Sequence, residues 1–241
     1  MNKKDIIKQI KASLKSSSTP AAKASFSRFF KEKVNGYGVK VPVVNRLAKE
    51  YYRKIKALPK KKIFSLCDRL MESGMIEEKF IAAEWAEEQA RNFIGSDFVI
   101  LEKWVKNYIS NWAECDSLCN HAVGSFISKY PEYISELKKW AGSNNRWVKR
   151  ASCVSLILPA RRGEFLSDVF ELADMLRNDP DDMVQKGYGW MLKEASRKHA
   201  KEVFNYVMKY KKTMPRTAFR YAIEKLPDGL KKKAMAKGNK I

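Results

Sequence analysis

Apolar residues recur along the chain with the spacing of one helix face, and this pattern constrains the fold more than any other feature. Near the amino terminus the i, i+3, i+4, i+7 spacing is followed by Ile6, Ile7, Ile10 and Leu14. No segment alternates apolar and polar residues as a half-buried strand would. Short stretches with Pro, Gly, Ser, Asp or Asn separate the periodic segments. The sequence predicts an all-α protein of about a dozen helices, most of roughly 10 to 17 residues.

A small residue followed three positions later by a large one recurs along the chain. The small members are Ala82, Ala151, Gly187 and Ala218, with Ser117 completing the series by position. Their spacing of 31 to 36 residues is close to that of arrays of paired helices. We therefore expect a HEAT-like solenoid of antiparallel helices with a concave basic face, forming one domain over residues 1–241. Residues 226–241 are expected to be a frayed basic tail.

The charge balance limits the partners of the chain. Lys and Arg number 48 against 27 Asp and Glu, which gives a formal charge of +21. Such an excess suits nucleic-acid phosphates, acidic lipids or an acidic protein, unless it is only a solubilising coat. Cations lie beside aromatic residues in the helical segments 146–152 and 183–190, which favours a sugar-phosphate partner. Without a bilayer-length apolar run or a secretory signal, we expect a cytoplasmic protein with no membrane contact.

The repeat also predicts a row of residues on one side of the solenoid. The positions just before the small residues are Ile81, Asp116, Arg150, Lys186 and Thr217. Trp112 lies one helical turn before Asp116, and Trp190 lies one turn after Lys186. This face would gather one carboxylate, two indoles and two cations.

Several of these residues have plainer interpretations. Asp116 could cap a helix that begins at Ser117. Cys115, Cys119 and His121 offer three soft metal ligands, but a fourth is missing and cysteine is often only a small buried residue, so we expect no metal and no cofactor. We expect four tryptophans in the core, namely Trp85, Trp104, Trp140 and Trp147.

Three segments resemble the bacterial DNA alkylation repair glycosylases of the AlkD type. They are Asn-Trp-Ala-Glu-Cys-Asp at 111–116, Arg-Trp-Val-Lys-Arg-Ala at 146–151 and Gly-Tyr-Gly-Trp-Met-Leu-Lys-Glu at 187–194. The stretch 37–42, followed by a basic helix with Arg46, is similar to the amino-terminal signature of that family. The resemblance runs from about residue 25 to 225. It implies a HEAT-like solenoid that cradles duplex DNA and removes N3- or N7-alkylated, cationic purines.

The resemblance also implies roles for single residues. Asp116 would be the catalytic carboxylate, and Trp112 and Trp190 would pack beside the deoxyribose of the lesion. Arg150 would contact the DNA backbone, and the matching segments extend the DNA-binding set to Lys149, Tyr37 and Arg46. Lys186, from the row of polar residues, joins this set. The position after Trp112, often acidic in relatives, is Ala113 here, and Glu114 follows it.

The implied reaction needs one acid only, because a cationic purine leaves as a neutral base. We expect a monofunctional, monomeric glycosylase that leaves an abasic site in double-stranded DNA and needs no obligatory protein partner. Two alternatives remain: a non-catalytic HEAT-repeat protein that binds distorted or branched nucleic acid, and a HEAT scaffold for an acidic protein.

Overall fold

The computed structural model describes residues 3–236, without the side chains of 3–5 and 26–28. Over this range the chain forms sixteen α-helices joined by short turns and contains no strand, which confirms the all-α prediction. Several helices have only six to nine residues, so they are shorter and more numerous than predicted. The chain divides into two compact units, Met1–Phe126 and Ile127–Ile241.

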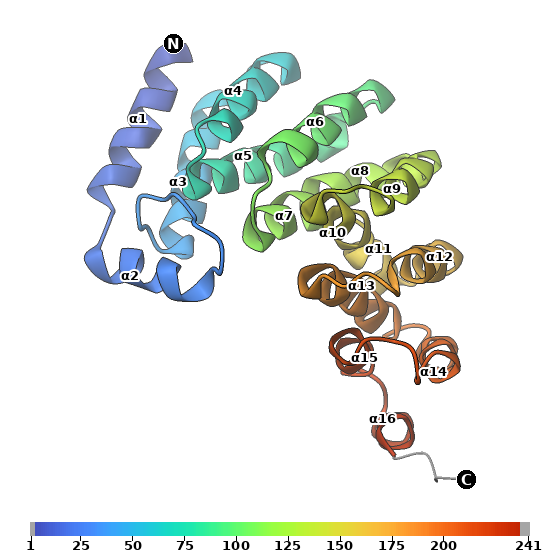
Figure 1. The fold of residues 1–241 in the computed structure, drawn as a ribbon. Helices are drawn as coiled ribbons and strands as arrows, with labels where there is room; N and C mark the ends of the chain where they lie inside the picture. The colour runs from blue at the N-terminus through green and yellow to red at the C-terminus, as the bar shows by residue number, and fades with distance from the viewer. Residues whose placement is uncertain (1–2, 237–241) are drawn as a thin grey trace. The chain divides into compact units, whose positions relative to one another are not determined.

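The first unit contains the helices drawn in blue and green in Figure 1. They are α1 (Lys3–Ser16), α2 (Pro20–Phe29), α3 (Val41–Ile55), α4 (Lys60–Glu72), α5 (Ile76–Glu88), α6 (Phe98–Tyr108) and α7 (Trp112–Leu118), with 3₁₀ turns at Ala90–Asn92 and Gly95–Asp97. A π-helical turn, Cys119–Val123, leads into α8 (Gly124–Lys129). Helices α3, α5 and α7 pack in succession, while α4 packs against α5 and α6.

The second unit continues the same pattern of packed helices. After a 3₁₀ turn at Pro131–Tyr133 it contains α9 (Ile134–Ala141), α10 (Arg146–Val154), α11 (Ile157–Arg162), α12 (Leu166–Leu176), α13 (Asp182–Ala195), α14 (Ala200–Lys209), α15 (Arg216–Ala222) and α16 (Asp228–Met235). Helices α10, α13 and α15 pack in succession. The segment 226–241, expected to be a frayed basic tail, instead contains the helix α16, and residues 237–241 lie outside the described residues.

The repeated small residues lie on the helices that pack in succession within each unit. Ala82, Ala151 and Ala218 are completely buried. A Cβ atom on Gly189 would lie 2.8 Å from Cβ of Tyr221 and 2.9 Å from the carbonyl oxygen of Ala218. Gly189 therefore permits a close approach of α13 to α15 that any larger residue would prevent.

The four tryptophans predicted for the core are buried, which confirms that prediction. Two of them also join neighbouring helices through their indole N–H. Trp85 on α5 donates to the carbonyl oxygen of Ala48 on α3 at 2.9 Å, and Trp104 on α6 donates to Oδ1 of Asp68 on α4 at 2.6 Å. Buried indoles normally find such an acceptor, so each ring contributes both apolar packing and a polar contact between helices.

Proline and glycine explain one of the unexpected helix breaks. Pro159 in α11 has no backbone N–H and so cannot donate to the carbonyl of Ser155, which lies between α10 and α11. Gly163 then ends α11 with a φ of 91°, the left-handed conformation common after helices.

None of the helices over residues 3–236 combines the length and the apolar composition needed to cross a membrane.

Candidate functional site

Helix α7 carries the carboxylate and one indole of the predicted site. Asn111 caps the helix, because its Oδ1 accepts a hydrogen bond from the backbone N–H of Glu114 at 3.0 Å. Asp116 therefore lies inside α7, and the alternative that it caps a helix starting at Ser117 is wrong. Trp112 and Asp116 are four residues apart, so they share one face of α7, and both are half-buried.

A buried ion pair fixes α7 to α5. Nζ of Lys79 donates to Oε2 of Glu114 at 2.9 Å, and the two side chains are only 6% and 1% exposed. The backbone N–H of Ser110 donates to the same oxygen at 2.9 Å, and Lys79 also donates to the carbonyl of Tyr108 at 2.6 Å. We call this pair the Lys79–Glu114 clamp. It holds the first turn of α7 in place, and Lys79 neutralises the Glu114 carboxylate that follows Ala113.

A cavity of about 500 Å³ opens beside the clamp in the first unit. Its walls come from α3, α5, α7 and the π-helical turn, and Trp112 and Asp116 both line it. The other lining residues are Val41, Asn45, Phe80, Ala83, Glu84, Glu87, Glu88, Ala113, Ser117 and His121. We call it the acidic cavity, because four of its side chains are carboxylates in a chain of strongly positive charge. Such a lining favours a cationic guest.

The π-helical turn explains how His121 reaches this cavity. Asp116 and His121 are five residues apart, a spacing that a regular α-helix would place on different faces. A turn with i to i+5 hydrogen bonds is wider, and such turns are frequent at functional sites. Cys115 and Cys119 are instead completely buried, whereas His121 is exposed. Among the described residues no three His, Cys, Asp or Glu side chains are placed so that they could hold a metal ion.

Trp112 lines both the acidic cavity and a second, apolar one. Phe30 stacks on Trp112 with ring centroids 5.5 Å apart and an interplanar angle of 27°. Both rings line a second cavity of about 640 Å³, whose walls include Phe29 and Pro42. Arg46 projects from α3 as an exposed cation outside both cavities.

Tyr37 holds its loop against α5. Its hydroxyl donates to Oε1 of Glu78 at 2.6 Å, and burial together with that carboxylate raises the pKa of Tyr37. The backbone N–H groups of Tyr37, Gly38 and Val39 all donate to the carboxylate of Glu77, at 2.8–3.0 Å. The loop thus binds an internal anion with its amides. The sequence did not indicate this role for Tyr37, because its hydroxyl contacts a residue 41 positions away.

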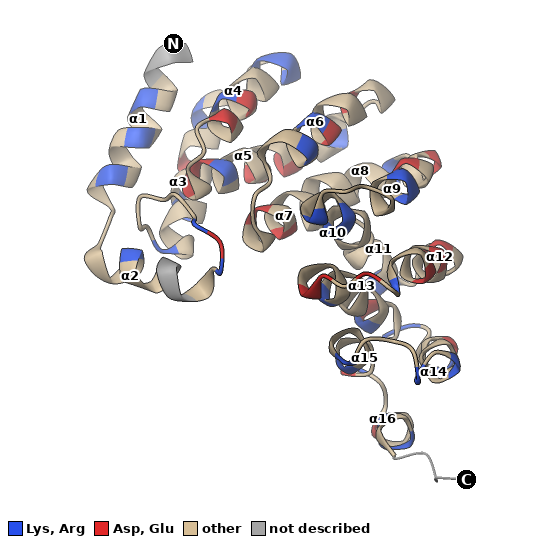
Figure 2. Cartoon of the chain, viewed as in Figure 1, with Lys and Arg blue, Asp and Glu red and all other residues tan. Residues whose placement is uncertain are grey.

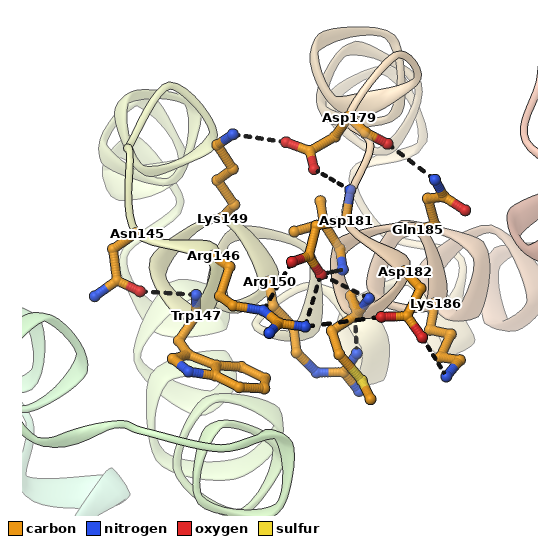
Figure 3. Close-up of polar contacts among 12 residues, drawn as sticks. Asn145, Arg146, Trp147, Lys149, Arg150, Asp179, Asp181, Asp182, Gln185 and Lys186 are labelled. Atoms are coloured by element: carbon orange, nitrogen blue, oxygen red, sulfur yellow. Dashed lines mark hydrogen bonds and ion pairs between the residues drawn. The ribbon is translucent and has the colours of Figure 1, made fainter. Parts of the chain in front are cut away.

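In the second unit the predicted cations lie on α10 and α13 (Figure 3). Arg150 is 5% exposed and its Nη1 donates to the carbonyl of Met183 at 2.6 Å. A Cβ atom on Gly187 would lie 3.3 Å from Cγ of Arg150, so the glycine makes room for the arginine stem. The geometry shows Arg150 joining α10 to the start of α13.

The neighbouring lysines are half-buried and paired with carboxylates. Nζ of Lys149 lies 2.6 Å from Oδ2 of Asp179, and Nζ of Lys186 lies 3.0 Å from Oδ2 of Asp182. Trp190 follows Lys186 by one turn of α13 and is also half-buried. Lys and Arg elsewhere are spread over the helices of both units rather than confined to one (Figure 2).

Comparison with known proteins identifies the family. A family described as DNA alkylation repair enzyme matches residues 10–226, nearly the whole chain. The chain belongs to this family. The resemblance inferred from the sequence is therefore confirmed, and membership of a DNA repair family makes DNA the class of substrate.

Solved structures share the fold of this DNA alkylation repair family member. One is a predicted DNA alkylation repair enzyme from Enterococcus faecalis, with a TM-score of 0.78 and 17% identity over 88% of this chain and 98% of that one. Another is smu.31 from Streptococcus mutans UA159, with a TM-score of 0.57 and 17% identity over 76% of this chain and 98% of that one. No curated protein sequence matches the chain significantly.

Proposed function

We propose that this chain is a monofunctional alkylpurine DNA glycosylase. It would hydrolyse the N-glycosidic bond of N3- or N7-alkylated, cationic purines in duplex DNA and leave an abasic site. The observation that supports this most is the pairing of Trp112 and Asp116 on one face of α7, where both line the acidic cavity.

Asp116 would act on the sugar. As the bond from C1′ to the purine breaks, its electron pair goes to the base and positive charge grows on the deoxyribose. A carboxylate beside that charge stabilises it and accepts the proton of the water that attacks C1′. The indole of Trp112 presents an electron-rich face to the same cation, an interaction worth about 0.5–2 kcal/mol.

The acidic lining supports a cationic substrate. An N3- or N7-alkylated purine carries a positive charge and departs neutral, so it needs no prior protonation. Glu84, Glu87 and Glu88 would favour that charged base over a neutral one. They would also repel phosphates, so the sugar and base, rather than the backbone, would face this cavity.

Cations outside the cavity would hold the DNA backbone. The proposed cations are Arg46, Lys149 and Lys186, and the hydroxyl of Tyr37 is a further proposed contact, with Trp190 packing beside the deoxyribose. Arg150 is buried against the carbonyl of Met183, so it would orient α10 and α13 rather than reach a phosphate. Such contacts read no sequence, and affinity should fall steeply with salt. We propose that the protein works as a monomer in the cytoplasm, without a cofactor or an obligatory protein partner.

A base-release assay tests this function. The protein is incubated with a duplex that contains one 7-methylguanine, and the free base is separated and quantified. We expect release of the methylated base, no release from the undamaged duplex, and strand cleavage only after alkali. Tight binding to bulged or branched duplex without any base release would favour the non-catalytic alternative and contradict the proposal.

A further inference from the structure

We propose that a cavity between α15 and α16 binds a phosphate group of the DNA backbone. The inference rests on the proposed function in one respect, namely that duplex DNA is the ligand. It adds a phosphate contact at the carboxyl-terminal end of the second unit to the contacts proposed on α3, α10 and α13. Such a contact would strengthen binding to any duplex without reading its sequence.

The cavity has a volume of about 510 Å³ and lies within the second unit. Thr217, Arg220 and Tyr221 of α15 line it, and their spacing of three and four residues places them on one face of that helix. Glu224 follows one turn later, and α16 contributes Lys231 to the same lining. We call it the α15–α16 cavity. Two helices thus direct four hydrogen-bond donors and one carboxylate to a single space.

The donors of the α15–α16 cavity lack acceptors within the described part of the chain. There, the guanidinium of Arg220 and the hydroxyls of Thr217 and Tyr221 make no hydrogen bond or ion pair. Nζ of Lys231 donates only to the backbone carbonyl of Glu224, at 3.4 Å, and pairs with no carboxylate among the same residues. Several donors that line one cavity and lack acceptors favour an anion with more than one oxygen.

The carboxylate of Glu224 is neutralised by cations that do not line the cavity. Its Oε2 lies 3.3 Å from Nζ of Lys193 on α13, and its Oε1 lies 4.0 Å from Nζ of Lys225. The charges of Arg220 and Lys231 are therefore not cancelled by the acid beside them. The α15–α16 cavity keeps a positive charge, which an anion can enter without repulsion.

A DNA phosphate suits this set of donors and the position of the cavity. Arginine binds phosphate oxygens in pairs, and threonine and tyrosine hydroxyls commonly donate to them. Thr217 occupies the repeat position on α15 that Lys186 occupies on α13. Lys193 follows Trp190 by one turn of α13, and its Nζ lies 5.6 Å from the ring centroid of Tyr221. The α15–α16 cavity therefore adjoins the helix face that we propose holds the backbone.

The salt dependence of duplex binding tests the inference. Binding of the full chain to an undamaged, fluorescent duplex is followed by anisotropy from about 50 to 200 mM potassium chloride. The double variant Arg220→Gln with Lys231→Gln should bind about 10-fold more weakly at low salt. Its slope of log affinity against log salt should be shallower by about one, the loss expected for one phosphate contact. Arg220→Lys alone keeps the charge and should keep the slope.

The matched control is Lys232→Gln with Lys233→Gln. Both lysines are exposed on α16 and lie outside the lining of the α15–α16 cavity. This variant loses the same charge, and we expect its affinity and slope to stay close to those of the wild type. Equal changes in the cavity and control variants would show only a general effect of net charge and would overturn the inference.

A direct readout separates the possible anions. The nitrogen-15 NMR signal of the Arg220 Nε–H, assigned through Arg220→Gln, is followed while undamaged duplex, inorganic phosphate or polyglutamate is added. We expect the duplex to shift this signal at concentrations of charge where the other two do not. A signal that moves with inorganic phosphate or polyglutamate but not with the duplex overturns the inference.

Failure of this inference can be distinguished from failure of the proposed function, because neither measurement uses a damaged base. Release of 7-methylguanine together with an unchanged slope in the cavity variant overturns this inference alone. A shallower slope in that variant, from a protein that releases no base, supports the phosphate contact and contradicts the proposed glycosylase.

Discussion

Two pairs of helices carry the same repeated small residues but pack in different ways. Between α5 and α7 the clamp of Lys79 and Glu114 makes the contact, and the acidic cavity opens beside it. Between α13 and α15 the contact is backbone against backbone, where Gly189 meets Ala218. A polar clamp can hold two helices together and still leave space for a ligand, whereas a glycine contact uses that space for packing.

The largest effect should come from breaking the clamp. Lys79→Met leaves the carboxylate of Glu114 buried without its cation, and removing one partner of a buried pair costs about 3–5 kcal/mol. Urea unfolding followed by tryptophan fluorescence measures this loss. Lys106→Met removes the cation of an exposed pair with Glu102 and should cost less than about 1 kcal/mol. Equal losses in the two variants would show that the clamp does not hold α7.

Substitution at the glycine contact should lower the unfolding free energy by less than breaking the clamp, but by a measurable amount. In Gly189→Ala the new methyl group overlaps Tyr221 and the backbone of Ala218, so we expect a loss of about 1–3 kcal/mol of unfolding free energy. Gly229→Ala on α16 is the matched control, since a Cβ atom there meets nothing within 4 Å. Thermal unfolding of both variants measures the difference. A neutral Gly189→Ala would show that α13 and α15 do not depend on this close approach.

The helix caps of the two units should differ in their contribution to the unfolding free energy, by a smaller amount. Asn111 caps α7 and Asn145 caps α10, each by accepting a backbone N–H at 3.0 and 2.9 Å respectively. Asn111 is completely buried and Asn145 is exposed. Asn111→Ala should therefore lose about 2 kcal/mol of unfolding free energy and Asn145→Ala about 0.5, the two ends of the usual range for caps. Urea unfolding of both variants measures the two losses, and equal losses would show that burial of the cap is irrelevant.

Substitution of two glutamates should have the smallest effects on the unfolding free energy, and the two effects should have opposite signs. Burial alone would raise the pKa of Glu194 in the second unit, but Arg161 at 2.7 Å and Arg197 at 2.6 Å outweigh it and lower that pKa. Its contribution to stability is present above the ordinary pKa of about 4.3 and is lost as the pH falls through the lowered value. Glu194→Gln should therefore destabilise at pH 7 and have less effect in acid.

Glu87 should behave in the opposite way. Its pKa is raised, so its contribution is full below about pH 4.3 and is lost as the pH rises through the raised value. Glu87→Gln should stabilise at high pH and change little in acid. Unfolding free energies of both variants from pH 3 to 9 measure the two slopes. Parallel pH profiles would contradict the different environments assigned to the two carboxyls.

The sequence predicted local features well. Helical spacing gave the all-α fold and the buried tryptophans, because both depend on periodicity along single helices. The four-residue interval between Trp112 and Asp116 correctly placed them on one face of α7. Their neighbouring cavity was not predicted, because its other walls come from helices that are far away in the sequence.

The sequence analysis did not predict how deeply side chains are buried or which distant residues pair with one another. The repeat register placed Arg150 in a row of polar residues, but it carries no information on depth, and the side chain is buried against α13. The partner of Glu114 lies 35 residues earlier, so only the folded chain reveals that Lys79 neutralises it. Glu87 was missed because its raised pKa comes mainly from burial, which the sequence does not reveal.

The central claim is that the Asp116 carboxylate stabilises the sugar cation, and a single-turnover measurement on Asp116→Asn tests it most directly. Base release from a 7-methylguanine duplex and the fraction of duplex bound are measured in the same samples, with Asp228→Asn, an exposed carboxyl of α16, as control. We predict that Asp116→Asn binds the duplex as the wild type does but releases the base at least about 100-fold more slowly. A release rate equal to that of the wild type at equal binding would contradict the claim.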